Sequence, residues 1–280
     1  MKKFQIVTNE SKDPNFTITH SLQDMITKRG GSFHTVVYHA NTMGMGEVDK
    51  TVDCVLVLGG DGTLLTVAHQ VSKKNIPILG INLGTLGFLA EVEVNKMEEA
   101  LDQLFSGQYF CEERMMLDGY LLREKEVIQI SPALNDITIT RCGSLQIISY
   151  SIYVNHKFLC RLNADGVILS TPTGSTGYSM SAGGPIADPS AAMILLTPIC
   201  AHTLTARSII LSSEDEIEIE IDTGKNGSSI TVEASADGNE KYLLKTGNRL
   251  RVGKALAKTK IIKLKETSFL EALHRKMHES

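Results

Sequence analysis

The stretch DCVLVLGGDGTLL, residues 53–65, decides the fold because it reads as a buried strand followed by a turn and a helix. Residues 53–58 are a near-continuous apolar run, which is typical of a parallel strand covered on both faces. Three glycines and an aspartate follow in GGDGT, residues 59–63, and apolar residues at helical spacing continue to residue 71. In an open parallel sheet, ligands bind at the edge where such strands end. The stretch therefore predicts an α/β domain with a ligand site at GGDGT.

The chain on either side of this stretch alternates strands with helices. Further strands are predicted at residues 4–8, 32–38 and 77–81. One helix is expected to begin with Asp13 as its N-cap and Pro14 as its first residue, and another with a capping box formed by Asn95 and Glu98. Such alternation predicts a parallel sheet with helices on both faces. We place this Rossmann-like α/β domain at residues 1–105.

Beyond the first domain, helical periodicity fades and short β-rich pieces follow, separated by turn residues. In residues 216–222, isoleucines alternate with acidic residues, which predicts a half-buried strand with its acids on a solvated face. The regular spacing of short strands predicts an antiparallel, β-sandwich-like domain over residues 106–266. Residues 267–280 read as a C-terminal helix, opened by a capping box of Ser268 and Glu271, that can pack back on the first domain.

Composition argues against several classes of function. The 280 residues carry 28 basic and 32 acidic side chains, for a net charge of −4, with no basic stripe that would attract nucleic acid. No run of 18 apolar residues predicts a membrane span, and the opening MKKFQIVTNE does not resemble a signal peptide. The five cysteines form no CxxC pair and the eight histidines never pair at a ligand spacing, so neither a disulfide framework nor a metal held by the protein is expected. These features favour a cytoplasmic protein.

The glycine-rich turn has the composition of a phosphate site. Gly59, Gly60 and Gly62 let the backbone approach a ligand closely, and the N–H groups of the turn, up to Thr63 at the start of the helix, face a phosphate. Asp61 would repel phosphate, so it either orients Mg²⁺ through water or takes a proton from an attacking hydroxyl. The alternative is an ordinary glycine-rich turn with Asp61 as a helix N-cap. No Walker loop, GxGxxG or protein-kinase motif is matched, and a second glycine turn, NLGTLGF, is expected to complete a phosphate cradle.

A second candidate site lies in ADGVILSTPTGSTGYSMSAGGPIADP, residues 164–189. A strand breaks there at Pro172 into a run of threonine, serine and glycine, which offers many donors and little bulk to a ligand rich in hydroxyls and phosphates. The run does not match the GxSxG nucleophile elbow. Asn135 and Asp136 open another strand, where an amide beside an acid can read ribose hydroxyls or a base edge. A plain Asx turn is the alternative for that pair.

Several segments of the chain resemble one enzyme family. They are GGDGT (59–63), NLGTLGFLAE (82–91), LND (134–136), DGVILSTPTGSTGYSMSAGGP (165–185), PICAHTLTARSIIL (198–211) and ADGNE (236–240). Together, over residues 53–265, they resemble bacterial NAD kinases. GGDGT is shared with diacylglycerol kinases and 6-phosphofructokinases, whereas the long hydroxyl-rich segment is specific to NAD kinases. The chain departs from the family at Asp136, where the family has Glu, and at Gly177, where it has Ala.

The resemblance implies transfer of the γ-phosphate of ATP to the 2′-hydroxyl of the adenosine ribose of NAD, which makes NADP, with Mg²⁺ or another divalent cation. Asp61 would act as the base on that hydroxyl. The residues implied for NAD are Asp61, Gly62, Asn135, Asp136, Gln146, Asn163, Asp165, Thr173, Thr176, Gly177, Tyr178, Ser179, Met180, Ser181 and Asn239. Those expected at the ATP phosphates are Gly59, Gly60, Gly62 and Thr63.

The resemblance also implies an α/β domain followed by a β-sandwich, with the nucleotide in the cleft between them, and a homotetramer or homodimer. It leaves open whether polyphosphate replaces ATP. Nucleic acid and membranes are not expected partners. Two alternative functions stay open: a lipid or sugar kinase that shares GGDGT, and a dinucleotide sensor without catalysis.

Overall fold

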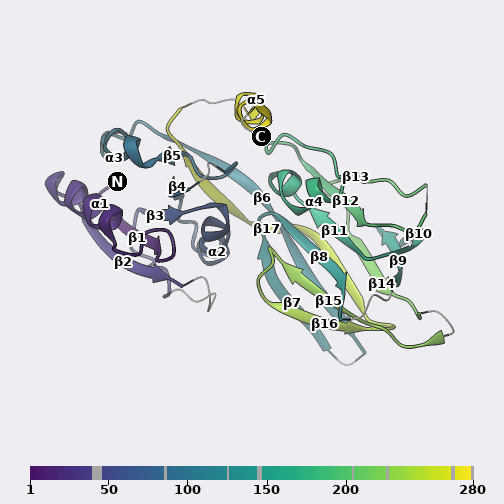
Figure 1. Ribbon diagram of the computed structural model, residues 1–280. Helices are drawn as coiled ribbons and strands as arrows, with labels where there is room; N and C mark the ends of the chain where they lie inside the picture. Colours follow the sequence, from purple (N-terminus) through teal and green to yellow (C-terminus); the bar gives the residue numbers. More distant parts are fainter. Residues whose placement is uncertain are drawn as a thin grey trace. The chain divides into compact units, whose positions relative to one another are not determined.

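The computed structural model describes residues 1–39, 46–84, 87–124, 126–143, 147–203, 205–224, 227–265 and 269–278. The chain divides into two compact units, Met1–Arg114 with Lys258–Ser280, and Met115–Ala257. Figure 1 labels the helices and strands of both. The end of the chain thus belongs to the same unit as its beginning.

The first unit is built on a parallel sheet. Its strands lie in the order β2, β1, β3, β4, and β17 continues the sheet where Ile261 pairs in parallel with Ile78. The strands are β1 (Lys3–Asn9), β2 (Ser32–Tyr38), β3 (Cys54–Gly59), β4 (Ile78–Asn82) and β5 (Val92–Glu93), with β5 beside β4. Every residue of β3 is buried, as expected for a strand with both faces covered. The α/β half of the predicted fold class is confirmed.

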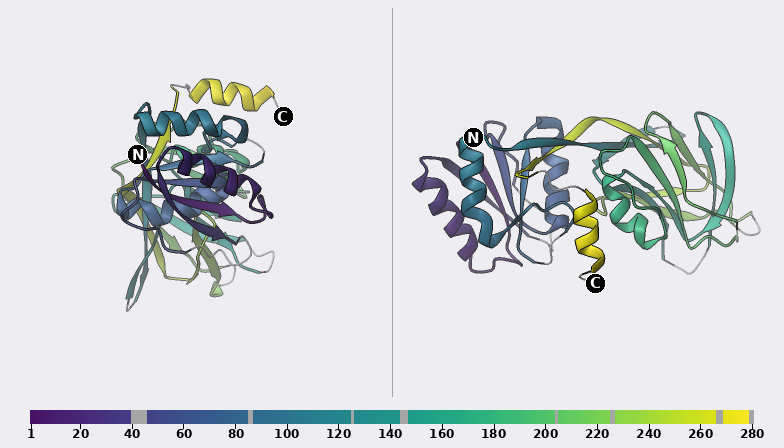
Figure 2. Two further views of the ribbon diagram at one scale, coloured as in Figure 1. Left: turned by 90° about the vertical axis from the view of Figure 1, so that its left-hand side faces the viewer. Right: turned by 90° about the horizontal axis from the view of Figure 1, so that it is seen from above.

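Helices cover both faces of this sheet. They are α1 (Thr17–Lys28), α2 (Asp61–Val71) and α3 (Met97–Ser106), with the 3₁₀ turns η1 (Ser72–Lys74) and η2 (Val94–Lys96). Leu22 of α1 and Leu101 of α3 share a core cluster with Leu56 of β3, and Figure 2 shows α1 and α3 side by side. The α2 helix lies on the opposite face, where Leu64 fills the space over Gly80 of β4. The carboxyl end of β3 is thereby held between packed layers.

The start of α1 differs from the prediction. The helix begins at Thr17 rather than at Pro14, and no side chain caps it in the usual position. The Asp13 carboxylate nevertheless accepts hydrogen bonds from the N–H of Thr19 at 2.9 Å and from its hydroxyl at 2.7 Å. Asp13 therefore satisfies donors of the first turn from a position further upstream than an N-cap.

The start of α3 also differs from the prediction. The helix begins at Met97, after a 3₁₀ turn, and no side chain caps it, so the expected capping box is wrong. Glu98 of that box instead forms an ion pair of 3.4 Å with Arg29, at the end of α1. Asn95 lies inside the 3₁₀ turn that leads into α3, so it does not occupy the N-cap position that the box requires.

The second unit contains two antiparallel sheets. One has the order β13, β12, β11, β8, β15, β16; the other runs β10, β9, β14, β17, with β6 beside β17 and β7 beside β6. The first comprises β8 (Asp136–Arg141), β11 (Gly166–Ser170), β12 (Met193–Ile199), β13 (Ile209–Ser212), β15 (Thr231–Ala236) and β16 (Lys241–Lys245). The second comprises β6 (Phe110–Arg123), β7 (Glu126–Ala133), β9 (Ile148–Val154), β10 (Lys157–Ala164), β14 (Ile217–Ile221) and β17 (Arg249–Lys263). Two short turns of helix, η3 (Thr173–Thr176) and α4 (Tyr178–Ser181), follow β11.

Apolar side chains from both sheets form one core in this unit. Ile139 and Val167 come from one sheet, and Ile219 and Leu250 come from the other. The isoleucines of β14 all enter the core, as the alternation of residues 216–222 predicts. Two sheets packed face to face around a shared core form a β-sandwich, which confirms the second half of the predicted fold class.

The structure divides the chain at residues other than the predicted 105 and 266. The chain passes from the first unit to the second after Arg114 and returns to the first after Ala257, so β6 and β17 each begin in one unit and end in the other. A boundary inside a continuous strand leaves no shift of composition that sequence reasoning could detect. The C-terminal helix α5 (Phe269–His278) is grouped with the first unit, and Ser268 of its expected capping box lies outside the described residues. None of the described helices is long and apolar enough to cross a membrane.

Candidate functional site

The GGDGT turn joins β3 to α2 in the first unit. Gly59 ends β3, Gly60 is the extended residue before the helix, and Asp61 is the first residue of α2. The Gly60 carbonyl accepts the N–H of Thr63 at 3.0 Å, which closes the first turn. A Cβ added at Gly60 or Gly62 would meet no atom within 4 Å. The turn therefore presents bare backbone at a helix N-terminus, where anions are favoured.

The Asp61 carboxylate points into the second glycine turn. Its Oδ2 accepts the N–H of Phe88 at 2.9 Å, and its Oδ1 accepts those of Leu89 and Ala90 at 3.3 Å each. A Cβ on Gly87 would overlap both carboxylate oxygens, so Asp61 can lie here only while residue 87 has no side chain. A carboxylate accepts about four hydrogen bonds, so one position is left for a hydroxyl or a water. The alternative of Asp61 as an N-cap is wrong, because the residue before it takes that position.

Backbone hydrogen bonds join the two glycine turns. The N–H of Leu83 donates to the Gly59 carbonyl at 3.0 Å. The Asn82 side chain donates to the Gly84 carbonyl at 2.6 Å and accepts the Gly84 N–H at 3.3 Å, which fixes the start of the second turn. The expected adjacency of the turns is confirmed, although residues 85 and 86 lie outside the described residues.

Asn9, at the end of β1, is a residue of this site that sequence reasoning missed. Its Nδ2 donates to Thr63 Oγ1 at 2.9 Å, and Ser11 Oγ donates to its Oδ1 at 2.7 Å. Thr63 is buried over Gly59, where an added Cβ would lie 2.6 Å from Thr63 Oγ1. The Thr63 side chain therefore braces the turn, and its contact with phosphate stays a prediction. A polar residue at the end of a strand that pairs in parallel with β3 is the signal that could have identified Asn9.

In the second unit, the LND turn is held from two sides. On one side the Asp237 carboxylate accepts the N–H groups of Leu134, Asn135 and Asp136, at 2.7, 2.8 and 2.9 Å. On the other side Thr171 donates its hydroxyl to the Leu134 carbonyl at 2.6 Å and its N–H to the Asn135 carbonyl at 2.8 Å. Asn135 Oδ1 is buried without a hydrogen-bond partner among the described residues, so the Asx-turn alternative is wrong.

The hydroxyls of the run after β11 fall into two groups. Ser175 Oγ accepts the Ala187 N–H at 3.0 Å, and Ser179 Oγ lies 3.1 Å from Thr197 Oγ1, so these two buried serines brace the loop. Tyr178, Met180 and Ser181 are exposed. Of the residues of this run predicted to bind NAD, Ser179 is therefore buried, whereas Tyr178, Met180 and Ser181 are accessible.

The other predicted ligand residues have varied surroundings. Thr173 is buried, whereas Thr176 and Gly177 are half-buried, and a Cβ on Gly177 would lie 3.5 Å from Asn135 Nδ2. Asn163 is exposed on β10. Asp165 Oδ1 lies 3.6 Å from Arg141 Nε, and the N–H of Asn239 donates to the Ala236 carbonyl at 2.9 Å. Gln146 lies outside the described residues.

Asp136 has an unusual electrostatic environment. The residue is 6% exposed, and burial, followed by the negative charge of Asp237, raises its pKa from 3.8 to about 7. Removing a carboxylate from water disfavours its charged form, and a second carboxylate nearby has the same effect. A neutral Asp136 can donate a hydrogen bond, whereas the ionised form only accepts.

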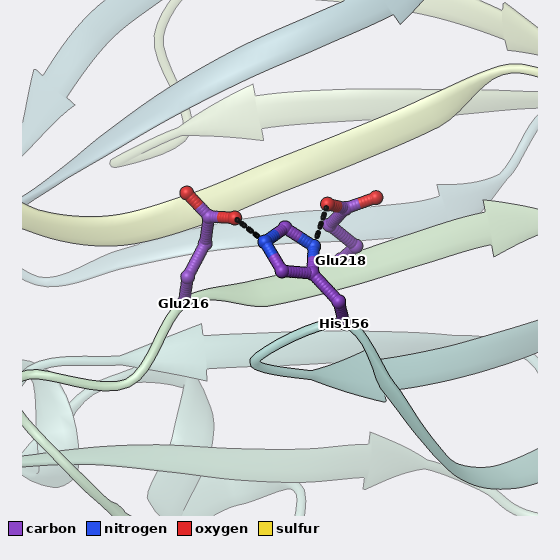
Figure 3. A group of neighbouring side chains, drawn as sticks. All are labelled: His156, Glu216 and Glu218. Carbon is purple, nitrogen blue, oxygen red and sulfur yellow. Dashed lines mark ion pairs between the residues drawn. The ribbon is translucent and has the colours of Figure 1, made fainter.

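A separate cluster of His156, Glu216 and Glu218 lies on the outer face of the β14 sheet (Figure 3). His156 Nδ1 is 3.3 Å from Glu218, and Nε2 is 3.8 Å from Glu216. These three side chains offer ligand atoms to a metal. However, Arg251 Nε lies 3.6 and 3.7 Å from the same two carboxylates, and Arg249 lies 3.5 Å from Glu218. Arginines thus supply the positive charge, and the acids expected on a solvated face are paired, with Glu218 only 6% exposed.

Comparison with known proteins covers both units. The ATP-NAD kinase N-terminal domain matches residues 18–109, and the ATP-NAD kinase C-terminal domain matches residues 134–264. An NAD kinase of Agathobacter rectalis is 45% identical over 282 residues, and the match covers 99% of both chains. An NAD kinase of Lachnoclostridium phytofermentans is 42% identical over 281 residues, again with 99% of both chains covered.

Two solved structures resemble this chain. Yeast NADH kinase complexed with NADH matches with a TM-score of 0.80 and 25% identity, over 99% of this chain and 88% of that one. An NAD kinase from Archaeoglobus fulgidus in complex with ATP has a TM-score of 0.77 and 20% identity over 99% of both chains, which shows a shared fold. The matched domains lie in both units of the chain, and the full-length relatives carry the same family name. The chain therefore belongs to the ATP-NAD kinase family.

Proposed function

We propose that the protein is an NAD kinase, which transfers the γ-phosphate of ATP to the 2′-hydroxyl of the adenosine ribose of NAD and so makes NADP. Family membership over the whole chain supports the activity. The observation that carries the proposal within the structure is the Asp61 carboxylate, held by three N–H groups beside the open backbone of Gly60 and Gly62.

Asp61 is well placed to act on a hydroxyl. Phosphoryl transfer passes through a loose transition state, so alignment and charge neutralisation supply most of the acceleration. Three hydrogen bonds fix the direction of the carboxylate and leave one acceptor position, which we assign to the hydroxyl proton. The bare N–H groups around Gly60 and Gly62, at the start of α2, would stabilise the phosphate oxygens.

We assign dinucleotide binding to residues of the second unit. Asn135 brings a buried side-chain oxygen, Oδ1, without a partner among the described residues, and a buried acceptor of that kind is satisfied when a ligand donates to it. Tyr178 and Met180 are exposed at 45% and 42%, and a base can stack on the tyrosine ring and contact the methionine sulfur. The remaining residues in this assignment are Asp136, Gln146, Asn163, Asp165, Thr173, Thr176, Gly177, Ser179, Ser181 and Asn239.

The GGDGT turn suits a divalent cation that arrives with ATP. Mg²⁺ binds oxygen ligands and keeps several of its waters. Asp61 is the one carboxylate of residues 59–63, and three of its acceptor positions are filled. We therefore propose that the cation, Mg²⁺ or another divalent ion, is held by phosphate oxygens and water, because the one remaining acceptor position of Asp61 takes the hydroxyl proton. Bound there, it would neutralise charge on the transferred phosphate.

Other parts of the proposal concern the donor and the assembly. We propose ATP as the donor, with polyphosphate as a second donor to be compared, and a homotetramer or homodimer in the cytoplasm. Exposed apolar side chains on the sheet-edge strands β10 and β13, Phe158 at 60% and Ile210 at 57%, support self-association. Light scattering on the purified protein measures the oligomer.

A coupled assay for NADP tests the function. The purified protein is incubated with NAD, ATP and Mg²⁺, and the NADP formed is read through an NADP-specific dehydrogenase. The alternative of a lipid or sugar kinase predicts product only from diacylglycerol or fructose 6-phosphate. A sensor without catalysis predicts NAD binding without turnover, so either pattern would replace the proposal.

A further inference from the structure

The Asp237 side chain forms hydrogen bonds to a turn outside its own hairpin. Asp237 and Gly238 lie between β15 and β16 with positive φ angles of 49° and 69°, a conformation that Gly, Asn and Asp tolerate best. A hairpin turn is complete with that backbone alone. The Asp237 carboxylate instead reaches the LND turn, which precedes it by more than a hundred residues, and accepts three consecutive N–H groups there.

Those three hydrogen bonds are short and involve a charged acceptor. They measure 2.7, 2.8 and 2.9 Å, and the N–H of Asp237 in turn donates to the Asp136 carbonyl at 2.9 Å. Hydrogen bonds to an ionised carboxylate are roughly twice as strong as neutral ones. The Asp237 side chain therefore holds three consecutive residues of the LND turn from one side.

The opposite side of the LND turn is also held, by hydrogen bonds and by close packing. Besides the two bonds from Thr171, Ser170 Oγ lies 3.2 Å from the Asn135 carbonyl oxygen and 2.9 Å from the Thr171 carbonyl oxygen, which share its single proton. A Cβ on Gly174 would overlap that same carbonyl, so the hydroxyl-rich run packs directly against it. The turn is thus held by the run on one side and by Asp237 on the other, and Asn135 Oδ1 is left without a hydrogen-bond partner among the described residues.

We propose that Asp237 is a positioning residue for NAD, which sets the orientation of Asn135 and Asp136 through the three N–H groups of the LND turn. The proposal rests on the assignment of Asn135 and Asp136 to the dinucleotide in the proposed function. Asp237 itself does not need to touch NAD. Its loss is expected to weaken NAD binding while leaving the ATP side of the reaction, built on the GGDGT turn of the first unit, unchanged.

The test is Asp237→Asn, because asparagine tolerates the same positive φ and so isolates the acceptor from the backbone. The amide nitrogen then faces N–H donors and cannot accept from them. We expect the KM for NAD, and the Kd for NAD measured by calorimetry, to rise about tenfold or more, in line with the loss of a charge-assisted hydrogen bond. The KM for ATP is expected to stay within twofold.

Asp222→Asn is the matched control. Asp222 belongs to the same unit, and its carboxylate accepts from Ser151 at 2.9 Å and pairs with Arg161 at 2.9 Å, away from the LND turn. A purely structural role for Asp237 predicts that both variants lower Tm and the active fraction, hence kcat, with the KM for NAD unchanged. Only a positioning role raises the KM for NAD in one variant and not in the other.

Asp237→Glu is a second variant, which keeps the proposal testable if Asp237→Asn does not fold. Asp237→Glu keeps the charge but is one methylene longer, so it cannot keep all three bonds, and we expect a smaller rise in the Kd for NAD, about threefold. A Kd for NAD equal to that of the wild type in either folded variant would overturn the proposal. Failure of the proposed function looks different, because the wild type itself would then form no NADP, and both inferences would fall together.

Discussion

Replacing the buried acid of the LND turn should make the protein more stable at neutral and alkaline pH. Asp136 has a pKa of about 7 in the folded protein, against the ordinary aspartate pKa of 3.8, because burial and then Asp237 disfavour its charge. Because this pKa is raised, the folded state holds the proton of Asp136 more tightly than the unfolded state does. The stability that this proton contributes is present below about pH 4 and is lost as the pH rises to about 7. At about 1.4 kcal/mol for each pH unit, the total is about 4 kcal/mol. Asp136→Asn removes this loss.

The assay is urea unfolding of wild type and Asp136→Asn at half-unit steps from pH 4.5 to pH 8.5, without nucleotide. The chain has no tryptophan, so tyrosine emission is a suitable probe. Five tyrosines belong to the second unit, namely Tyr120, Tyr150, Tyr153, Tyr178 and Tyr242, against Tyr38 and Tyr109 in the first. The signal therefore reports mainly on the unit that contains the substitution.

The informative quantity is the difference in unfolding free energy, variant minus wild type, at each pH. We expect this difference to rise by about 1.4 kcal/mol per pH unit up to about pH 7 and then to level off. Any constant cost of burying the amide shifts the whole curve without changing its slope. A difference that stays flat between pH 5 and pH 7 would refute the reasoning, since it would mean that Asp136 titrates alike in both states.

Three further predictions concern the first unit. Asp61→Asn should keep the Kd for NAD and lower kcat by about 10²–10⁴, and near-normal turnover would remove Asp61 from the mechanism. Gly87→Ala should lower kcat by about 10² or more, since its Cβ displaces the Asp61 carboxylate. Gly84→Ala is the control, because its Cβ would meet nothing closer than 3.9 Å. Equal kcat values for the two variants would contradict this prediction. Asp13→Asn should destabilise by about 1 kcal/mol at pH 7. Burial raises the pKa of Asp13, but hydrogen bonds from Thr19 and Ile18 lower it overall. The stability lost in Asp13→Asn, measured by urea unfolding, should therefore vanish as the pH falls below that pKa. A loss of stability that is unchanged at pH 3 would count against this prediction.

Features that depend on neighbours along the chain were predicted well. The alternation around Ile219 depends only on the period of a strand, and the apolar run before GGDGT depends only on burial of both faces. Both patterns are complete within a few residues. The fold class, and the position of Asp61 at the carboxyl end of a strand, therefore followed from the sequence.

Features that depend on strand register escaped prediction. The bond from Asn9 to Thr63 exists because β1 and β3 pair in parallel, so that both strands end at the same edge. The reach of Asp237 to the LND turn depends on the pairing of β15 with β8. No window of local sequence contains these partners.

The Asp61 carboxylate occupies the space that a side chain at Gly87 would need, which limits the substitutions that either position tolerates. One position supplies a carboxylate and the other supplies the absence of a side chain, so a substitution at either alone leaves a hole or a collision. We expect the two positions to vary together or not at all among homologues, which an alignment can test by covariation. Engineers who seek a new acceptor specificity would do best to leave this pair untouched and redesign elsewhere.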